Sequence, residues 1–588
     1  MSVRLRFDFA DPSGRVTTRI FEKPVAVIEA TRLADVVPAL AAAEAARAAG
    51  RFVAGAVAYE AAPAFDAALA TRPPGPLPLA WFAVFDAPID PGPEVDPDIT
   101  KIRVDAGNAW TADVTPAAHA AAIARVRAAI AAGDSYQANY TFRLRSRLDV
   151  ATLAARYAHL RAAHRVPFAA HLDMGRWQIL SLSPELFFHL HGRTLTTRPM
   201  KGTMPRGRFE AEDTVHAEAL RSSAKNRAEN VMIVDLMRND LGRIAEIGSV
   251  AVPSIFDVER YRSVFQMTST VTGQVRPGTT VVDIFKALFP AGSITGAPKT
   301  SSMRLIADLE PAPRGVYCGA IGLLAPDGGT TFNVAIRTAV VDAASGEAEY
   351  GVGGGITWDS TPGDEYAEAI SKAGFLDPVP ACSLIETLRL DDGRLVRRDG
   401  HLARLAKSAR YFDIPFDRTR IDAALDAHTR DRAHGRHRVR LTLAPAGEVA
   451  VESRPFVLHD HAADPPRRVP TVLARHPIAS ADIWLFHKTT RRTVYDAHCA
   501  AHPDAFDVLL WNERRELTEF TIGNVVVEFE GRRVTPPVTC GLLAGVFREA
   551  LLDAGVIAER IVTIDDLARA SRAWLVNSLR EWVEVEVK

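Results

Sequence analysis

The stretch TRPMKGT, residues 197–203, is the segment around which the rest of the sequence is organised. Only ten of the 70 lysine and arginine residues are lysines, so the chain carries almost all of its positive charge on arginine. A lysine at 201 therefore suggests a specific use, because an amine can lose its proton and act as a nucleophile whereas a guanidinium cannot. Pro199 and Gly202 predict a fixed turn that presents the Lys201 side chain. The alternative is a surface lysine on a hairpin, and the motifs elsewhere in the chain weigh against it.

Length and composition limit the class of protein. A chain of 588 residues is longer than one hydrophobic core usually organises, so two or three domains are expected. The formal net charge of −1 gives no sign of nucleic-acid or anionic-membrane binding, and we expect small molecules and proteins as partners. The N-terminus lacks the apolar core of a signal peptide and no apolar run has membrane-spanning length, which predicts a cytoplasmic location. The four cysteines form no metal or disulfide pattern and are expected to be buried thiols.

The periodicity of the first half predicts where polar side chains meet apolar surfaces. Residues 116–133 are expected to form a helix capped by Thr115, followed by a strand that carries Gln137. One helix is expected over residues 212–245, with Glu229 and Asp240 on the same stripe as apolar residues. A carboxylate on a buried stripe needs a partner or a metal ion; the alternative is a glutamate that reaches solvent.

Small residues mark ligand-facing backbone farther along. The loop GSITGAPK, residues 292–299, allows backbone N–H groups to approach an anion, although many such loops are only turns. A hairpin is expected across Asp327-Gly328-Gly329, with Arg337 pointing from its second strand. Residues 353–355, three glycines, give an uncovered strand against which a ligand can lie. Glu365, Glu368 and Lys372 fall on one helical face, where a solvated salt-bridged surface is the alternative.

These pieces together resemble the chorismate-utilising enzymes, the family of anthranilate synthase and aminodeoxychorismate synthase component I. The motifs SPELF, TRPMKGT, AENVMIVDLMRND, GSITGAPK, YCGAIG, VAIRT, GGGITWDS and EYAEAISKA occur in the family's order over residues 110–376. The resemblance implies two packed antiparallel sheets surrounded by helices. It also implies a Mg²⁺ ion held by Glu229 and Glu368, with Glu365 nearby, that binds the ring carboxylate of chorismate. The implied substrate-binding residues are Gln137, Thr203, Gln266, Thr295, Gly296, Tyr317, Arg337, Gly353, Gly354, Gly355 and Lys372.

Two positions sort the branches of the family, and a third departs from its pattern. Isochorismate-forming members have a lysine base where this sequence has Gln137, so an ammonia nucleophile is favoured over water. Anthranilate synthases usually have alanine at the position of Lys201. A lysine there resembles aminodeoxychorismate synthase, in which it is proposed to attack C2, expel the C4 hydroxyl and be displaced as ammonia enters at C4. Many relatives have histidine where this chain has Gln266, and glutamine cannot protonate the leaving hydroxyl, so its proton donor stays open.

The second region resembles the fold-type IV pyridoxal-phosphate enzymes, most closely aminodeoxychorismate lyase, over residues 383–588. The motifs HKTTRR, LTEFTIGN, GLLAGVFR and NSLREW occur in that family's order. A two-subdomain α/β unit is implied, in which Lys488 binds pyridoxal 5'-phosphate covalently and Glu519 pairs with the pyridine nitrogen. Arg404 and the backbone of residues 521–523 and 545–546, which include Thr521, Ile522, Gly545 and Val546, would hold the phosphate. An exposed lysine is the alternative for Lys488; if Arg491 and Arg492 face the site, they would help to lower its pKa.

The two resemblances together predict an α+β protein with domains at residues 1–376 and 383–588, joined by a linker at 377–382. The expected activity is bifunctional. A transaminase-class synthase makes 4-amino-4-deoxychorismate from chorismate and ammonia, and a lyase then makes 4-aminobenzoate and pyruvate for folate biosynthesis. A separate glutamine amidotransferase subunit is the expected ammonia source, and a homodimer through the lyase domain is left open. The alternatives are an anthranilate synthase component fused to an aminotransferase-like domain, and a non-catalytic chorismate-binding regulator.

Overall fold

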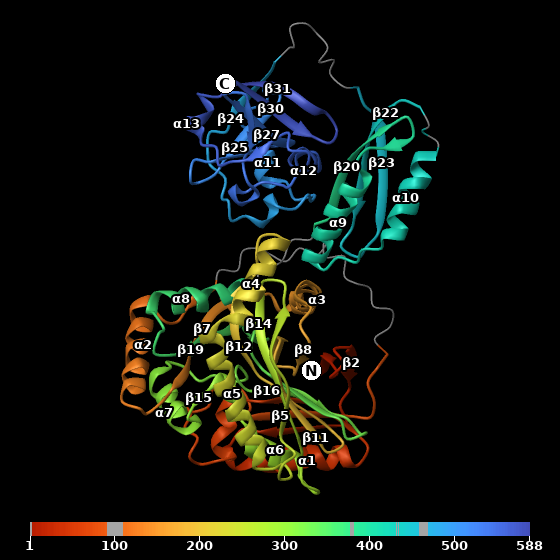
Figure 1. The fold of residues 1–588 in the computed structure, drawn as a ribbon. Helices are drawn as coiled ribbons and strands as arrows, with labels where there is room; N and C mark the ends of the chain where they lie inside the picture. Colours follow the sequence, from red (N-terminus) through yellow and green to blue (C-terminus); the bar gives the residue numbers. More distant parts are fainter. Residues whose placement is uncertain (1–2, 91–109, 377–381, 431, 433, 458–467) are drawn as a thin grey trace. The chain divides into compact units, whose positions relative to one another are not determined.

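The computed structural model describes residues 3–90, 110–376, 382–430, 432, 434–457 and 468–588 (Figure 1). The chain divides into two compact units. The first contains Met1–Pro205 and His216–Pro380, and the second contains Arg206–Val215 and Ala381–Lys588. Residues 377–381 of the expected linker lie outside the described residues.

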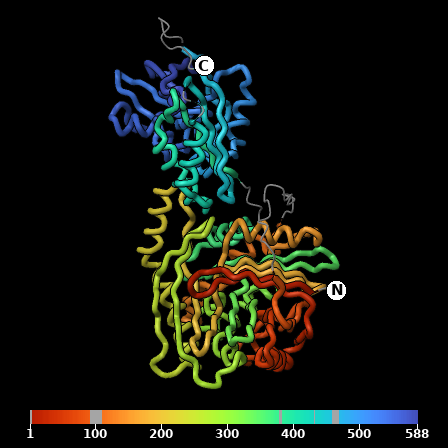
Figure 2. Tube along the Cα trace, turned by 90° about the vertical axis from the view of Figure 1, so that its right-hand side faces the viewer, coloured from red at the N-terminus to blue at the C-terminus, as the bar shows by residue number. Residues whose placement is uncertain are grey.

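The first unit contains two large antiparallel sheets, as predicted. In the described residues one sheet has the strand order β15 (Gly296–Ala297), β7 (Gln137–Arg147), β19 (Glu347–Ile356), β18 (Thr338–Asp342), β9 (Trp177–Ser183), β8 (Phe168–Asp173), β1 (Arg4–Ala10) and β2 (Val16–Glu22), with β6 (Thr111–Ala112) on β7. The other has the order β12 (Met200–Pro205), β14 (Val264–Gln274), β11 (Thr194–Arg198), β10 (Leu186–His191), β17 (Thr330–Val334), β16 (Ala320–Leu324), β4 (Phe52–Val57), β5 (Ala80–Phe85) and β3 (Ala26–Ala30), with β13 (Ala251–Arg260) on β14. In Figure 2 the N-terminal strands, in red, run along the edge of the first sheet, where β1 pairs with β8.

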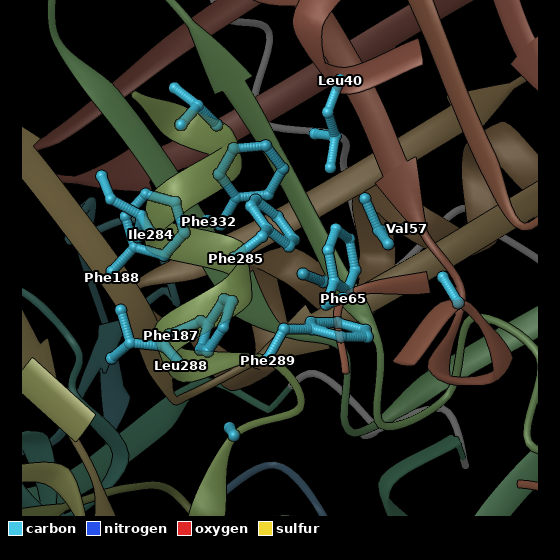
Figure 3. Close-up of a cluster of buried hydrophobic side chains, with 14 of the residues drawn as sticks. Leu40, Val57, Phe65, Phe187, Phe188, Ile284, Phe285, Leu288, Phe289 and Phe332 are labelled. Carbon is cyan, nitrogen blue, oxygen red and sulfur yellow. The ribbon is translucent and has the colours of Figure 1, made fainter. Parts of the chain in front are cut away.

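Phenylalanine side chains form the centre of the largest core of this unit (Figure 3). The ring of Phe285, on α6 (Val281–Leu288), lies 5.2 Å from that of Phe332 in an edge-to-face arrangement. Phe332 in turn lies 5.3 Å from Phe188 on the neighbouring strand β10. Helix α1 (Leu33–Ala48) closes the same core with Val36 and Leu40. Each such pair stabilises the fold by roughly 0.5–1.5 kcal/mol beyond the effect of the buried area. The aromatic core therefore stabilises the packing of α1 and α6 on the sheet.

The predicted helix over residues 212–245 is two helices. α4 (Glu210–Ser222) and α5 (Ala224–Gly242) are separated by Ser223, which has extended backbone angles (φ −62°, ψ 112°). The Ser223 hydroxyl accepts a hydrogen bond from the Asn226 N–H, so it caps the second helix and ends the first. On the predicted stripe, Asp240 is buried and pairs with Lys299 at 2.8 Å, the partner that a buried carboxylate needs.

Most other elements of this unit agree with the sequence. α2 (Pro116–Ala131) is capped by Thr115, and α7 (Lys299–Leu309) begins at the last residue of the GSITGAPK stretch. The expected hairpin is β16 with β17. Arg337 does not lie on its second strand, because the chain turns at that residue in the left-handed region (φ 51°) between β17 and β18. The remaining helices near the sheets are α3 (Leu153–His164) and α8 (Pro362–Ser371).

The second unit is built on two further sheets. One has the order β21 (Arg394–Leu395), β20 (Leu384–Asp391), β22 (Arg436–Leu443) and β23 (Val449–Pro455), with α9 (Arg398–Phe412) and α10 (Arg418–Arg430) packed on it. The other is mixed and runs β26 (Leu517–Phe520), β25 (Val508–Trp511), β24 (Val469–Leu473), β31 (Glu581–Val587), β30 (Arg572–Asn577), β27 (Gly523–Phe529), β28 (Arg532–Thr535) and β29 (Ala558–Glu559). The helices α11 (Thr493–Ala500), α12 (Val546–Asp553) and α13 (Ile564–Leu567) belong to this larger part. The two sheets fit the predicted pair of subdomains.

The ten-residue stretch 206–215 packs as part of the second unit. The Phe209 ring stacks on Phe486 with centroids 5.2 Å apart, and the Tyr411 hydroxyl donates to the Gly207 carbonyl at 2.8 Å. His487 lies with Nε2 3.1 Å from the Arg208 carbonyl oxygen. This stretch therefore holds the residue that directly precedes Lys488.

The structure bears on two further expectations, one about membrane-spanning segments and one about the cysteines. In the described part of the chain, every helix is too short or too polar to cross a membrane. The prediction of four buried thiols holds for Cys318, Cys382 and Cys540 but is wrong for Cys499. Cys499 is exposed because α11 is a short helix that fully buries only Tyr495.

Candidate active sites

A cavity of about 410 Å³ in the first unit collects most of the side chains predicted for chorismate. Twelve predicted residues line it: Lys201, Thr203, Glu229, Gln266, Tyr317, Arg337, Gly353, Gly354, Gly355, Glu365, Glu368 and Lys372. Three others do not line it. The Thr295 hydroxyl turns back to the carbonyls of its own turn, Gly296 pairs with Ala138 in the sheet, and Gln137 lies behind Gly355.

Lys201 projects from a strand and not from the predicted turn. It lies in β12, where the pairing with β14 shifts register between Met200 and Thr203 and Gly202 adopts φ 98°. Such a bulge re-aims the neighbouring side chain. Burial lowers the pKa of Lys201, against the opposing effect of the Glu229 and Glu185 carboxylates. Within the residues that the structure describes, the Lys201 amine makes no hydrogen bond or ion pair, so it is free to meet a ligand.

The Lys201 amine lies against Gly355 of strand β19, next to the Gln137 side chain. A Cβ atom at position 355 would lie 2.7 Å from the Lys201 Nζ and closer still to the Gln137 Nε2. Gln137 is buried, and its Oε1 has no hydrogen-bond partner. The glycine is therefore needed for the amine to reach this position.

Glu185 is a residue of this cavity that the sequence analysis did not select. It follows Pro184 at the break between β9 and β10, is 3% exposed, and accepts a 2.5 Å hydrogen bond from Ser293. Burial raises its pKa to about 7, although Ser293 and Lys201 oppose the shift. The signal in the sequence was a single acid inside the apolar run ILSLSPELFF, where an ionised side chain has a high desolvation penalty. A carboxyl with this pKa can hold and release a proton near neutral pH.

The three glutamates expected at Mg²⁺ line one part of the cavity but do not form a closed ligand group. Glu229 comes from α5, and Glu365 and Glu368 come from α8. Among the described residues no three His, Cys, Asp or Glu side chains are gathered tightly enough to hold a metal ion. Glu368 pairs with Lys372 at 2.9 Å, and Glu365 accepts a 2.6 Å bond from Ser360. These carboxylates still fit a hard cation that takes most of its ligands from substrate and water. Burial and then neighbouring carboxylates raise the pKa values of Glu229 and Glu365, so a bound cation would stabilise their ionised forms.

The cavity of the first unit also contains a cationic side chain, Arg337, that can bind an anionic group of a ligand. Burial lowers the pKa of Arg337, whose guanidinium lies 4.6 Å over the Phe375 ring. Its buried Nη1 has no hydrogen-bond partner. A buried donor without an acceptor is costly, so a ligand oxygen is the expected partner.

The second unit contains a cavity of about 310 Å³, and every predicted cofactor residue lines it. These residues are Arg404, Lys488, Glu519, Thr521, Ile522, Gly545 and Val546. Burial lowers the pKa of Lys488 to about 8, with help from Arg404 and Arg492. Arg491 also lines this cavity, with its guanidinium 4.7 Å over the Trp484 ring. A lysine with this pKa is partly unprotonated near neutral pH, as a nucleophilic amine must be.

Glu519 is held by three donors in the same cavity. The Tyr495 hydroxyl donates at 2.7 Å, the Leu543 N–H at 3.1 Å, and the Asn524 side-chain amide at 3.1 Å. Burial raises the pKa of Glu519 to about 7. A cationic ring nitrogen placed here would keep the carboxylate ionised.

The protein groups that were predicted to bind the phosphate are arranged differently from the prediction. The backbone N–H groups of Thr521 and Ile522 donate to the Asp507 carboxylate at 3.2 and 3.3 Å, so both already have an acceptor. Arg404 donates to Glu386 through two nitrogens and to the Ala544 carbonyl. Two buried atoms that line this cavity have no partner, the Nε2 of His401 and the hydroxyl of Ser578.

The residues present therefore fit pyridoxal phosphate. Gly545 and Val546 begin α12, whose first N–H groups are suited to a phosphate. With Arg404 and the unpartnered Ser578 hydroxyl they supply donors in one cavity with a lysine amine and a buried glutamate. The sequence analysis missed Ser578, although NSLREW was among the motifs that it recognised.

Comparison with known proteins finds two families along the chain. Residues 6–378 match the family described as chorismate binding enzyme, and residues 383–587 match Amino-transferase class IV. Anthranilate synthase component 1 of Streptomyces coelicolor is 44% identical over 265 residues, which are 45% of this chain and 51% of that protein. Aminodeoxychorismate synthase component 1 of Salmonella typhimurium is 41% identical over 265 residues, 45% of this chain and 58% of that protein. The chain spans about half the length of these curated relatives.

A solved structure agrees with the fold of the first unit. Anthranilate synthase component I from Streptococcus pneumoniae TIGR4 has a TM-score of 0.50 and 25% sequence identity, over 64% of this chain and 92% of that one. The sheets define an α+β protein, and each of its two units contains a cavity lined by a lysine. Because the first family match covers more than half of its residues, the chain belongs to the chorismate binding enzymes. It carries in addition a domain with the class IV aminotransferase fold.

Proposed function

We propose that residues 1–376 convert chorismate and ammonia to 4-amino-4-deoxychorismate, and that residues 383–588 convert this product to 4-aminobenzoate and pyruvate for folate biosynthesis. The observation that carries the proposal is the free Lys201 amine, which lines the same cavity as three glutamates and lies against Gly355 beside Gln137. A nucleophilic amine at this point favours amination of the ring at C4 over the reaction at C2 that anthranilate synthesis requires.

In the first site the roles are divided between Lys201 and Glu185. The Lys201 amine attacks C2 of the ring, both ring double bonds shift, and the C4 hydroxyl leaves as water with a proton from Glu185. Ammonia then enters at C4 and Lys201 leaves C2, while a proton from ammonia returns to Glu185. The raised pKa of Glu185, about 7, supports this donor role, and Gln266 has no proton to give.

Mg²⁺ would be held by Glu229 and Glu368, with Glu365 nearby. When bound, the ion supplies positive charge that offsets the ring carboxylate of the substrate. Arg337, with its unpartnered Nη1, and Tyr317 would bind the second carboxylate. Activity in EDTA equal to activity in Mg²⁺ would remove the metal from the proposal.

In the second site pyridoxal phosphate, when bound, supplies an electron sink next to the substrate amine. Lys488 removes the proton from C4 of the ring, and enolpyruvate leaves from C3 as the ring becomes aromatic. Glu519 would orient the pyridine nitrogen, and Tyr495 with Asn524 would fix Glu519 in turn. Arg404, Ser578 and the start of α12 would hold the phosphate.

Ammonia would come from a separate glutamine amidotransferase. Glutaminases of this kind use a cysteine nucleophile, and no cysteine lines either cavity in the part of the chain that the structure describes. The relative from Salmonella typhimurium is named as component 1 of its synthase, which supports a second component for this chain also.

Two alternatives remain distinct in what they predict. An anthranilate synthase component fused to an aminotransferase-like domain has a relative at 44% identity, but it has no use for the Lys201 amine. A non-catalytic regulator has no use for two buried lysines with lowered pKa values. The Lys488→Ala variant separates these cases: with chorismate, Mg²⁺ and ammonium it should consume chorismate and accumulate 4-amino-4-deoxychorismate. Release of 4-aminobenzoate at the wild-type rate would show that the second half is not the lyase.

A further inference from the structure

A row of arginines crosses the four-stranded sheet of the second unit. Arg438 on β22 is directly opposite Arg389 on β20 and directly opposite Arg454 on β23. Residues opposite one another in an antiparallel sheet lie on the same face, and like charges in such pairs are destabilising. The row therefore has an energetic penalty that counter-ions must relieve.

Among the residues that the structure describes, ion pairs neutralise only one end of the row. Arg389 pairs with Asp391 at 3.0 Å and with Glu581 at 3.2 Å. Arg438 forms no ion pair with any residue in the described ranges. Burial lowers its pKa, and three neighbouring arginines lower it further. Glu452, on the neighbouring strand, opposes the shift, but among the described residues no carboxylate lies within ion-pair distance of this half-buried guanidinium.

Arg438 lines the cavity that holds Lys488, and two more arginines line it with few counter-charges. Arg440, two residues along the strand, pairs in the described part of the chain only with the largely exposed Glu452, at 3.7 Å. Arg580 lies in the turn between β30 and β31, with its guanidinium 5.4 Å from the Phe456 ring and 6.0 Å from Phe506. Within the described chain Arg580 also has no carboxylate at ion-pair distance. Among the described residues that line this cavity the acid is Glu519, and its carboxylate already accepts three hydrogen bonds.

We propose that Arg438, Arg440 and Arg580 form a carboxylate-binding subsite that selects a substrate with two carboxylates for the Lys488 site. The inference rests on the proposed lyase function and names the residues that set its substrate class. 4-Amino-4-deoxychorismate carries a ring carboxylate and an enolpyruvyl carboxylate, whereas most amino acids offered to an aminotransferase carry one. Arginine binds carboxylates through two parallel N–H donors, which gives geometry as well as charge.

The subsite also favours release of the products. Cleavage of the C3–O bond divides a dianion into 4-aminobenzoate and pyruvate, each with one carboxylate. A cavity that needs two carboxylates to satisfy its arginines binds each product more weakly than the substrate, so products leave after each turnover.

The test measures the binding of simple anions to the full-length holoenzyme by calorimetry, with isophthalate as the dicarboxylate and benzoate as the monocarboxylate. The wild-type protein should bind isophthalate about tenfold or more tightly than benzoate, because a second charge-assisted contact is gained. Arg438→Gln and Arg580→Gln should each bring this ratio close to one and raise KM for supplied 4-amino-4-deoxychorismate more than they lower kcat. Arg438→Lys, which keeps the charge, should show an intermediate ratio.

Arg454→Gln is the matched control, because Arg454 belongs to the same row but does not line the cavity. It should leave the ratio of dissociation constants unchanged within about twofold. A wild-type protein without preference for isophthalate, or glutamine variants that keep the preference, would overturn the subsite. The release of pyruvate tests the proposed lyase function separately. A protein that prefers isophthalate but releases no pyruvate has the subsite and lacks the lyase reaction.

Discussion

The Lys201 amine lies against Gly355, so that a Cβ atom at residue 355 would come within 2.7 Å of Nζ. The same Cβ would come within 2.0 Å of the Gln137 Nε2, and both contacts are with the ends of flexible side chains, so Gly355→Ala should fold but displace the amine. Because misplacement of a catalytic group by about 1 Å costs on the order of 10²-fold in rate, synthase turnover should fall by about that factor. Gly363→Ala is the control, since nothing lies within 4 Å of a Cβ at that position. Equal activity of the two variants would show that the position of the amine is not important.

Lys201→Ala should lose aminodeoxychorismate formation by at least about 10³-fold, the scale seen when a nucleophile is removed. Lyase activity on supplied 4-amino-4-deoxychorismate should stay at the wild-type level, because Lys201 lines only the cavity of the first unit. Lys286→Ala, on the exposed face of α6, is the control. Chromatography of the products would also show whether anthranilate forms, since alanine is typical of that branch. Near-normal synthase turnover would exclude a covalent role for Lys201.

Glu185 should determine how the synthase depends on pH. The group acts as an acid in its protonated form, and its pKa is about 7. Synthase kcat should therefore fall as pH rises through about 7, and Glu185→Gln should lower kcat by about 10²–10⁴-fold and remove this limb. Steady-state rates between pH 5.5 and 9 on both proteins provide the measurement, with pH limits chosen about 1.5–2 units around that pKa. A limb that persists in Glu185→Gln would assign the proton to another group.

Lys488 should control cofactor loading in the same pH range but with the opposite sign. Its pKa of about 8 means that the reactive, unprotonated amine increases with pH. The rate at which apoprotein mixed with pyridoxal phosphate gains the visible band should rise about fivefold between pH 7 and 8 and level off above about pH 9. A rate that keeps rising about tenfold per unit to pH 10 would indicate an ordinary lysine pKa. Lys488→Ala should show no band at any pH.

The sequence predicted the side chains that line the cavities better than it predicted their backbone. Motif order was enough to select Lys201, Glu229 and Glu368, which the structure brings into one cavity. The turn expected at Lys201 is a bulged strand, because a register shift depends on the pairing partner β14, about 60 residues farther along the chain. The single helix expected over 212–245 is broken at Ser223, since its cap competes with the apolar period that suggested one helix.

Other features depend on contacts that no local pattern contains. Glu185 gains its raised pKa from burial beside Ser293, 108 residues farther along the chain, and Arg337 turns toward the cavity only because the chain reverses between β17 and β18. Asp507, which takes the N–H groups expected to bind phosphate, lies 14 residues before Thr521. The packing of residues 206–215 in the second unit is likewise a tertiary feature.

The most direct test of the central claim is the identity of the aromatic product formed from chorismate. The full-length protein, loaded with pyridoxal phosphate, is incubated with chorismate, Mg²⁺ and ¹⁵N-ammonium, and the products are separated and examined by NMR. We predict 4-aminobenzoate with the label on the amine para to the carboxylate, and an equal amount of pyruvate. Anthranilate, with the label ortho to the carboxylate, or isochorismate without label, would contradict the account.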